Sequence, residues 1–348
     1  MQKGKASIIF EQAPCIYSAA SIVGQKEGEG PIGSCFDQVE QDPMFGQKSW
    51  EAAESELQRR TALLNLEKSG VEKEEVRYLF AGDLLGQIVA TSFGLMELEI
   101  PLFGLYGACS TMGEAMSLAA MTVGGGFASS AIAMASSHFA SAERQFRFPL
   151  AYGNQRPFST TWTVTGCGSV LIGKEGLKEK KKTGNSGPSA RIAGLTPGKI
   201  VDMQIHDSMN MGAAMAMAAV DTILQNLRDF QVEPSYYDKI ITGDLGCVGQ
   251  SLLFEFMDRA GWDVRGIHMD CGMTIFDSSS QDTHSGGSGC GCSAVTLCSY
   301  ILPKIQRGDW KRVLFLPTGA LLSQISFNEG QSVPGIAHGV VLEHISQS

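Results

Sequence analysis

The sequence predicts a five-layer α/β/α/β/α sandwich made of two duplicated halves, on the basis of three observations. A strand that ends in Gly-Asp-Leu follows a long helix twice, at 82–84 and at 243–245, a separation of 161 residues. A helix that is apolar on nearly every face follows a turn in each half, at 110–122 and at 292–305, and such helices are buried between layers. Strands and helices alternate, which favours mostly parallel strands with right-handed crossovers.

The first half begins with a short strand at 6–10 and continues into a Gly- and Pro-rich stretch at 24–33, which we expect to be an irregular surface segment. A long helical pattern covers 50–67 and is broken at Gly70. A buried strand is expected at 77–81, directly before the first Gly-Asp-Leu triplet.

Cys109 lies where a second strand of the first half meets the apolar helix. The preceding segment is apolar and flanked by Pro101 and Gly107, so we expect a short buried strand there. A cysteine at such an elbow lies at the positive end of the helix, where backbone N–H groups favour the thiolate. The alternative is that Cys109 is a small buried hydrophobic residue. If it is functional, it should begin a buried helix and face a cleft between the halves.

The second half repeats this order, with a helix at 210–227 and a strand at 239–242. The 161-residue shift superposes Thr61 on Thr222 and the two Gly-Asp-Leu triplets on each other. Later matches need a shift of 182, so about 21 extra residues (182 minus 161) lie in the second half, and the Ser- and Gly-rich segment 277–289 is the expected insert.

The ends of the halves fix the predicted domains. Each half closes with a strand rich in glycine and small apolar residues, at 166–172 and 337–342. The charged segment between them is expected to be a solvated connector. We therefore assign residues 1–173 to the first half, 174–189 to the connector and 190–348 to the second half.

The composition is that of a globular protein, because 43% of the 348 residues are hydrophobic and 18% are charged. With 36 acidic and 27 basic residues the net charge is −9, which disfavours binding to nucleic acid. Nine cysteines without disulfide-framework spacing, and an N-terminus without an apolar core, predict a reducing cytosolic location and no signal peptide. No apolar run reaches the roughly 18 residues of a spanning helix, so none is expected.

Two aspartates occupy related positions, because Asp83 and Asp244 each end the first strand of a half. Each can cap the turn that follows it. Alternatively, two carboxylates near one cleft can help to hold a calcium ion. Arg144 and Arg147 are the candidates for binding a carboxylate ligand, since guanidinium groups match carboxylates; a salt-bridged surface is their other interpretation.

Several motifs carry a resemblance that extends from about residue 10 to residue 343. The phrases AGDLL, GACST, SSHFASAERQFRFP, TGDLG, DCG, GGSGC and TGALLS resemble the stage V sporulation protein AD family, on the thiolase and ketoacyl synthase fold. The resemblance implies a thiolase-like fold and a subunit of a spore channel complex that binds dipicolinic acid, or its calcium chelate, during uptake into the developing spore and in its release in germination. It also implies a homodimer, a peripheral location on the spore inner membrane, and no cofactor apart from calcium within the ligand chelate.

The resemblance also bears on catalysis. Thiolases and ketoacyl synthases use the elbow cysteine with two partners, usually His with His or Asn, or His with a second Cys, which hold the thioester oxygen and move protons. Here Asp244 stands at the ketoacyl synthase histidine position, and Thr318 and Gly319 occupy the loop that carries the second thiolase cysteine. The first hypothesis is therefore a non-catalytic binding protein. The alternatives are a thioester-dependent acyltransferase that uses Cys109, and a structural subunit with a vestigial cleft.

The two remaining candidates are histidines. His138 follows a strand and can reach the pocket mouth, while His284 matches the thiolase Gly-His loop but lies in the polar insert. No metal ligand and no catalytic residue is assigned. The predicted ligand-binding residues are Cys109, Asp83, His138, Asp244, Thr318, Gly319 and Arg144.

Overall fold

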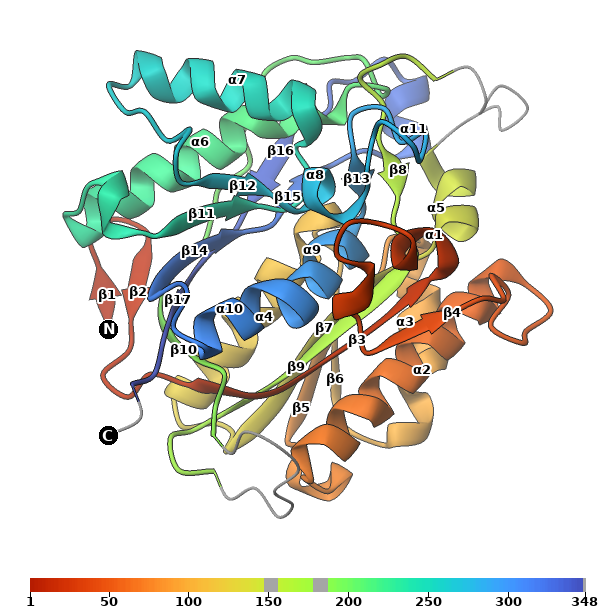
Figure 1. Ribbon diagram of the computed structural model, residues 1–348, viewed down its shortest axis with the longest axis vertical. Coiled ribbons are helices and arrows are strands. Elements are labelled where there is room, and N and C mark those ends of the chain that lie inside the picture. The colour runs from red at the N-terminus through yellow and green to blue at the C-terminus, as the bar shows by residue number, and fades with distance from the viewer. Residues whose placement is uncertain (147–155, 178–186, 347–348) are drawn as a thin grey trace.

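The computed structural model describes residues 1–146, 156–177 and 187–346, and the side chains of 144–146 lie outside this description. One continuous sheet organises both halves (Figure 1). Its main path begins with the second-half strands β12 (His268–Asp270), β11 (Lys239–Thr242), β14 (Arg312–Leu316), β17 (Gly339–Glu343) and β10 (Ala190–Thr196). It continues through the first-half strands β3 (Cys15–Gly24), β9 (Gly166–Gly173), β7 (Ser130–Ser137), β5 (Tyr78–Gly82) and β6 (Leu102–Leu105).

The strand order reads the same from both ends of this path, which confirms the duplication. β5 pairs in parallel with both β6 and β7, and β11 pairs in parallel with both β12 and β14. β7 and β14 each continue to an antiparallel neighbour, β9 and β17 respectively. The strands that precede Asp83 and Asp244 therefore hold equivalent topological positions.

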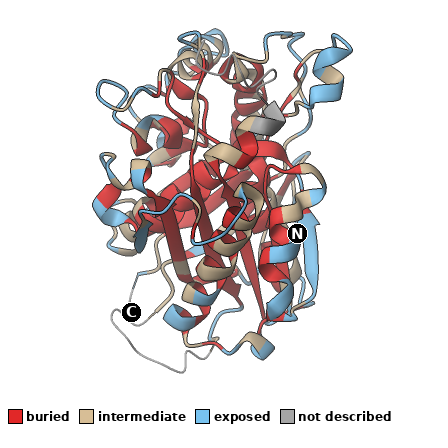
Figure 2. Cartoon of the chain, turned by 90° about the vertical axis from the view of Figure 1, so that its right-hand side faces the viewer, coloured by how far each residue is buried: buried red, intermediate tan, exposed pale blue. Residues whose placement is uncertain are grey.

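Helices form three of the five layers (Figure 1). The middle layer contains α4 (Thr111–Gly124), α9 (Cys290–Thr296), a π-helical turn (Leu297–Ile301) and α10 (Leu302–Gln306). The outer layers contain α2 (Trp50–Ser69) and α3 (Val89–Leu95) on one side, and α6 (Met211–Phe230) and α7 (Gly246–Arg259) on the other. Figure 2 shows the sheet and the middle layer as one buried core. The five-layer prediction is confirmed.

The long helices begin and end at residue types that favour helix termini. Ser49 caps α2 by accepting a hydrogen bond from the Ala52 N–H, and Gly70 ends it in the left-handed region at φ 63°. Asn210 caps α6 in the same way through the Ala213 N–H. These side chains satisfy N–H groups that a first helical turn leaves free.

Shorter elements complete the described chain. They are β1 (Gln2–Lys3), β2 (Ser7–Ile9), α1 (Gln25–Gly28), β4 (Gln38–Glu40), α5 (Phe139–Phe146), β8 (Trp162–Thr163), α8 (Cys271–Ile275), β13 (Gly287–Ser288), β15 (Thr318–Ala320), α11 (Gln324–Asn328) and β16 (Gly335–Ala337). Among the residues that the structure covers, no helix is both long and apolar enough to cross a membrane.

Three expectations are corrected. The segment 24–33 is not wholly an irregular surface, because it contains α1 with Glu27 fully buried. Strands β3 and β10 were not expected, since their small and hydroxyl-bearing residues give no alternating pattern. The strand before Cys109 is an exposed edge strand rather than a buried one, with Phe103 52% exposed.

Candidate functional site

The Cys109 elbow is a strained turn that is held in place by hydrogen bonds from side-chain hydroxyls to backbone carbonyls. Ala108 has φ 50°, which a residue with a Cβ adopts at a cost of about 1–3 kcal/mol. The Ser110 hydroxyl donates to the Gly107 carbonyl at 2.6 Å, and the Thr111 hydroxyl donates to the Ala108 carbonyl at 2.7 Å. Cys109 therefore lies directly before α4 with 6% of its surface exposed, as the sequence predicted.

A narrow cavity lies beside the Cys109 thiol. Its volume is about 40 Å³. Both halves contribute walls, so the predicted cleft between the halves is confirmed. The lining residues are Leu84, Ala108, Cys109, Glu143, Thr161, Thr163, Met211, Ser288, Ala320 and Leu322.

Asp244 lies behind this cavity and accepts hydrogen bonds from every side. One carboxylate oxygen accepts from the Thr318 hydroxyl at 3.0 Å, and the other accepts from the Ser288 hydroxyl and the Gly289 N–H, each at 3.0 Å. The Cys109 thiol lies close enough to this carboxylate for each group to shift the pKa of the other. Ser288 lies 3.9 Å from the Cys109 sulfur, so thiol, hydroxyl and carboxylate form one network.

The electrostatics of this network oppose a thiolate. Burial and the charge of Asp244 raise the pKa of the Cys109 thiol well above its ordinary value. Burial also raises the pKa of Asp244, to about 6, so at neutral pH the carboxylate carries the charge and the thiol keeps its proton. The expectation that the helix N-terminus favours the thiolate is therefore wrong, because desolvation and a buried anion outweigh it.

Asp270 holds the loop that presents Asp244, and sequence reasoning missed it. Its carboxylate accepts from the Thr242 hydroxyl at 2.7 Å, from the Leu245 N–H at 2.9 Å and from the Gly246 N–H at 3.2 Å. One neighbouring side chain thus binds the Thr242 hydroxyl before Asp244 and the backbone N–H groups after it. The DCG phrase contains this residue, but its contacts depend on the pairing of β11 with β12.

The loop at 318–319 supports the elbow from the other side. Thr318 belongs to the Asp244 network, as described above. A Cβ on Gly319 would lie 2.5 Å from the Gly107 carbonyl oxygen, so a side chain there would displace the elbow. Gly319 is therefore needed for close backbone approach and does not itself line the cavity.

Asp83 does not belong to this cavity. Its carboxylate accepts from the Leu85 N–H at 2.7 Å, from the Thr91 N–H at 2.7 Å and from the Thr91 hydroxyl at 2.6 Å, which makes it a turn cap. Because donors occupy the oxygens of both aspartates, a calcium site shared by Asp83 and Asp244 is not supported. Among the described residues, no group of three His, Cys, Asp or Glu side chains could hold a metal ion.

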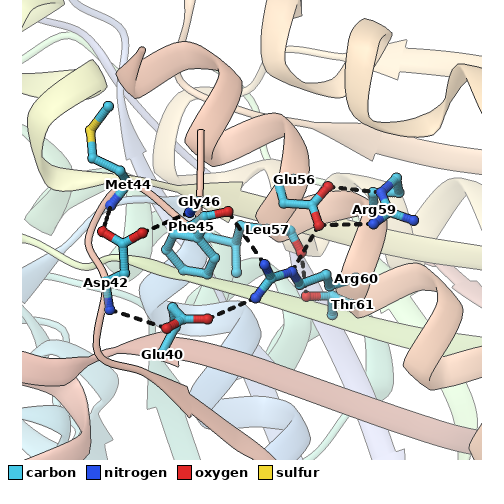
Figure 3. Close-up of polar contacts among 10 residues, drawn as sticks. All are labelled: Glu40, Asp42, Met44, Phe45, Gly46, Glu56, Leu57, Arg59, Arg60 and Thr61. Atoms are coloured by element: carbon cyan, nitrogen blue, oxygen red, sulfur yellow. Dashed lines mark hydrogen bonds and ion pairs between the residues drawn. The ribbon is translucent and has the colours of Figure 1, made fainter. Parts of the chain in front are cut away.

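His138 also points away from the cavity, into a packed loop of the first half. Its Nδ1 accepts from the Ala140 N–H at 3.2 Å, so Nε2 carries the proton and donates to the Pro43 carbonyl at 2.8 Å. Figure 3 shows what shapes that loop: Asp42 accepts from the Met44 and Gly46 N–H groups. His138 therefore begins α5 and does not reach the pocket mouth.

The remaining predicted residues have separate outcomes. Arg144 lies in α5, but its side chain is outside the described residues, and Arg147 is outside them entirely. The His284 Nδ1 donates to the Pro157 carbonyl at 3.0 Å, its Nε2 lies 3.2 Å from the Asp282 carboxylate, and the residue does not line the cavity. Ser288, Glu143 and Thr163 line the cavity and were not predicted; the GGSG phrase was the available signal for Ser288.

Comparison with known proteins gives one family match and several structural neighbours. The family model described as stage V sporulation protein AD matches residues 4–343. Stage V sporulation protein AD of Bacillus subtilis is 41% identical over 340 residues, which is 98% of this chain and 97% of that relative.

Two solved structures illustrate the fold. Human mitochondrial 3-ketoacyl-CoA thiolase, solved in complex with CoA, has a TM-score of 0.60 at 11% identity and covers 97% of this chain and 100% of its own. The 3-oxoacyl-[acyl-carrier-protein] synthase III of Aquifex aeolicus has a TM-score of 0.57 at 11% identity and covers 95% and 99%. At these identities the likeness shows a thiolase-like fold and nothing about activity.

Proposed function

This chain belongs to the stage V sporulation protein AD family, and on that premise we propose that it is a non-catalytic protein that binds dipicolinic acid, or its calcium chelate, in the cavity beside Cys109. Family membership gives it a role in sporulation. The proposed step is uptake of the ligand into the developing spore, with a further part in its release during germination. In this proposal the protein acts on the spore inner membrane with the other subunits of a spore channel complex.

The observation that carries the non-catalytic part is the carboxylate beside the elbow thiol. An acyl-enzyme forms when a thiolate attacks a thioester, and a neighbouring imidazole normally takes the proton and pairs with the anion. Here the neighbour is Asp244, which at neutral pH is itself negative and destabilises a second charge on sulfur. The acyltransferase alternative would require the protein to form two adjacent buried anions.

The chemistry of the cavity lining suits a ring with polar ends. The small volume of the cavity indicates closely spaced walls. Leu84, Met211 and Leu322 supply apolar surface, and the hydroxyl oxygens of Thr161, Thr163 and Ser288 supply polar atoms. The described lining contains the carboxylate of Glu143 and no lysine or arginine, which favours the calcium chelate over the bare dianion.

Calorimetric titration with dipicolinate, with and without calcium, tests this function. We expect saturable binding of one ligand per chain, tighter when calcium is present. Replacing the lining residue Ala320 by leucine should fill the cavity and lower the affinity for dipicolinate at least tenfold. The buried walls leave no room for both the leucine side chain and the ligand.

The matched control is Ala260→Leu, because Ala260 is exposed at the end of α7. Both variants should keep the far-ultraviolet circular dichroism of the wild type. Absence of binding heat with either form of the ligand would overturn the proposal. A stable acyl adduct on Cys109 after incubation with acyl-thioesters, followed by release of a condensed product, would establish the acyltransferase instead.

We also propose that two copies of the chain associate through β6. This strand pairs with β5 on one side, and no described strand pairs with its other side. Leu102 and Phe103 on it are 37% and 52% exposed, and an exposed apolar edge strand is a site for pairing with another chain.

A positive charge placed on β6 should separate the two chains of the proposed dimer. We expect the wild type to sediment as two 37.2 kDa chains and Phe103→Lys as one, because a buried lysine would lack a partner at the interface. Ile325→Lys, which changes an equally apolar residue that is 72% exposed on α11, is the control and should remain dimeric. A monomeric wild type at micromolar concentration would contradict the proposed dimer.

A further inference from the structure

One wall of the Cys109 cavity is a short segment that lies outside the main sheet. Strands β8 and β13 pair only with each other among the described strands. Three residues of this segment line the cavity: Thr163 in β8, the adjacent Thr161, and Ser288 in β13. We call residues 277–288 the strap; it contains all but the last residue of the predicted polar insert 277–289, and it ends at β13 (Figure 1).

The strap lies in a high-energy conformation. Asp282 and His284 have φ of 52° and 51°, a left-handed backbone that costs a non-glycine residue about 1–3 kcal/mol. Between them, Thr283 is fully buried and its hydroxyl has no hydrogen-bond partner among the described atoms. Such a buried unpaired group is rare in native proteins, and here it coincides with two strained residues.

A clasp of three side chains holds the strap down. Trp162 of β8 lies between two cations, with the Lys26 ammonium 4.5 Å and the Arg156 guanidinium 5.4 Å from its ring centre. The alternation of strand residues directs Trp162 away from the cavity that Thr161 and Thr163 face.

Lys26 and Arg156 also bind the strap through hydrogen bonds and an ion pair. Lys26 donates to the Gln281 carbonyl at 2.5 Å, and the Gln281 amide donates back to the Lys26 carbonyl at 2.7 Å. Arg156 pairs with the Asp282 carboxylate at 2.6 Å and donates to the Asp282 carbonyl at 3.1 Å. The Arg156 side chain is 9% exposed and that of Asp282 is 72% exposed, so solvent reaches this ion pair from the Asp282 side.

The cavity needs such a movable wall. A cavity volume of about 40 Å³ corresponds to a few water molecules, so a ring-sized ligand does not fit unless one of the walls moves. The opposite walls belong to the buried elbow and to β15, where Gly319 packs against the Gly107 carbonyl.

We propose that the strap is the gate of the Cys109 cavity, held shut by the clasp of Trp162, Lys26 and Arg156 against its own strained backbone and unpaired Thr283 hydroxyl. Opening separates β13 from Asp244, withdraws Ser288 and exposes Cys109. The gate rests on the proposed function only for the identity of the ligand, because the opening itself concerns the protein alone.

Alkylation of Cys109 by iodoacetamide, followed by peptide mass spectrometry, measures opening without any ligand. Arg156→Gln loosens the clasp and should raise the rate at Cys109 about fivefold, which corresponds to roughly 1 kcal/mol at one cation–π contact. Thr283→Val replaces the unpaired hydroxyl by a methyl group and should lower the rate. Arg307→Gln removes an exposed arginine paired with Asp309, away from the strap, and should leave the rate unchanged.

Stopped-flow mixing with dipicolinate, with and without calcium, completes the test. Association and dissociation should both be faster in Arg156→Gln and slower in Thr283→Val. Altered alkylation in a protein that binds neither form of dipicolinate supports the gate and removes the proposed ligand. Unchanged alkylation in both variants overturns the gate, whatever the ligand does.

Discussion

Replacing Asp244 by asparagine should raise the rate of Cys109 alkylation by iodoacetamide at least tenfold at pH 8. The thiolate is the reactive species, and the wild-type thiol keeps its proton because it is buried beside the Asp244 carboxylate. At an effective dielectric constant of 20, two unit charges about 4 Å apart repel by about 4 kcal/mol, and a third of that already gives a tenfold change. Asparagine keeps the side-chain size and removes the charge.

Two further variants separate charge from packing. Thr318→Val removes the 3.0 Å hydroxyl donor to Asp244 but leaves the charge, so it should change the rate much less. Asp244→His supplies the imidazole that can pair with a thiolate, and should give the fastest alkylation of the series. Equal rates in the wild type and Asp244→Asn would mean that access, and not charge, limits the reaction, and would remove the main physical argument against acyl chemistry.

The sequence was sufficient for the fold where one half repeated the other. The Gly-Asp-Leu triplets marked β5 and β11, and the sheet places these two strands symmetrically. β3 could not be found in the same way, because CIYSAASIVG lacks alternation and is buried on both faces. Apolar residues before Cys109 predicted a strand but not its place at the sheet edge. A run of apolar residues does not distinguish a strand in the middle of a sheet from an exposed edge strand.

For the site, local sequence located the elbow but not its electrostatics. Cys109 was placed correctly because GACST lies between an apolar strand and an apolar helix. The charge that sets its pKa comes from Asp244, which is 135 residues away along the chain (244 minus 109). His138 was misplaced for a similar reason, because only the loop around Pro43 determines which way its ring turns.

Stability should fall as the pH rises from about 6.5 to 8, and Glu54 is expected to be a main cause. Glu54 is fully buried, and its oxygens accept from the Ser136 hydroxyl at 2.8 Å and the Ser141 hydroxyl at 2.6 Å. Burial, with the nearby charge of Asp83, raises the pKa of Glu54 to about 8. Burial likewise raises the pKa of Glu27 to about 7.

The sign follows from the protons bound in each state. Between about pH 4.5 and 8 the folded protein keeps a proton on Glu54 that the unfolded chain has lost, so stability decreases as the pH rises through this window. Buried histidines act in the opposite direction: burial lowers the pKa of His268 and of His338 to about 4, so their contribution is lost only as the pH falls below about 6.5. Between about pH 4.5 and 6.5, the carboxyl groups lower the stability as the pH rises and the histidines raise it. Above about pH 6.5 only the carboxyl groups change the stability.

Glu54→Gln should therefore flatten the alkaline side of the stability curve. Glutamine keeps an acceptor for one serine hydroxyl and a donor for the other, and it cannot lose a proton. Urea unfolding at pH 5, 6, 7 and 8 should show the wild type losing of the order of 3 kcal/mol between pH 5 and 8, and the variant losing much less. Glu67→Gln, an exposed residue on the same helix, should reproduce the wild-type slope. A Glu54→Gln curve parallel to that of the wild type would show that Glu54 is already ionised in the folded protein.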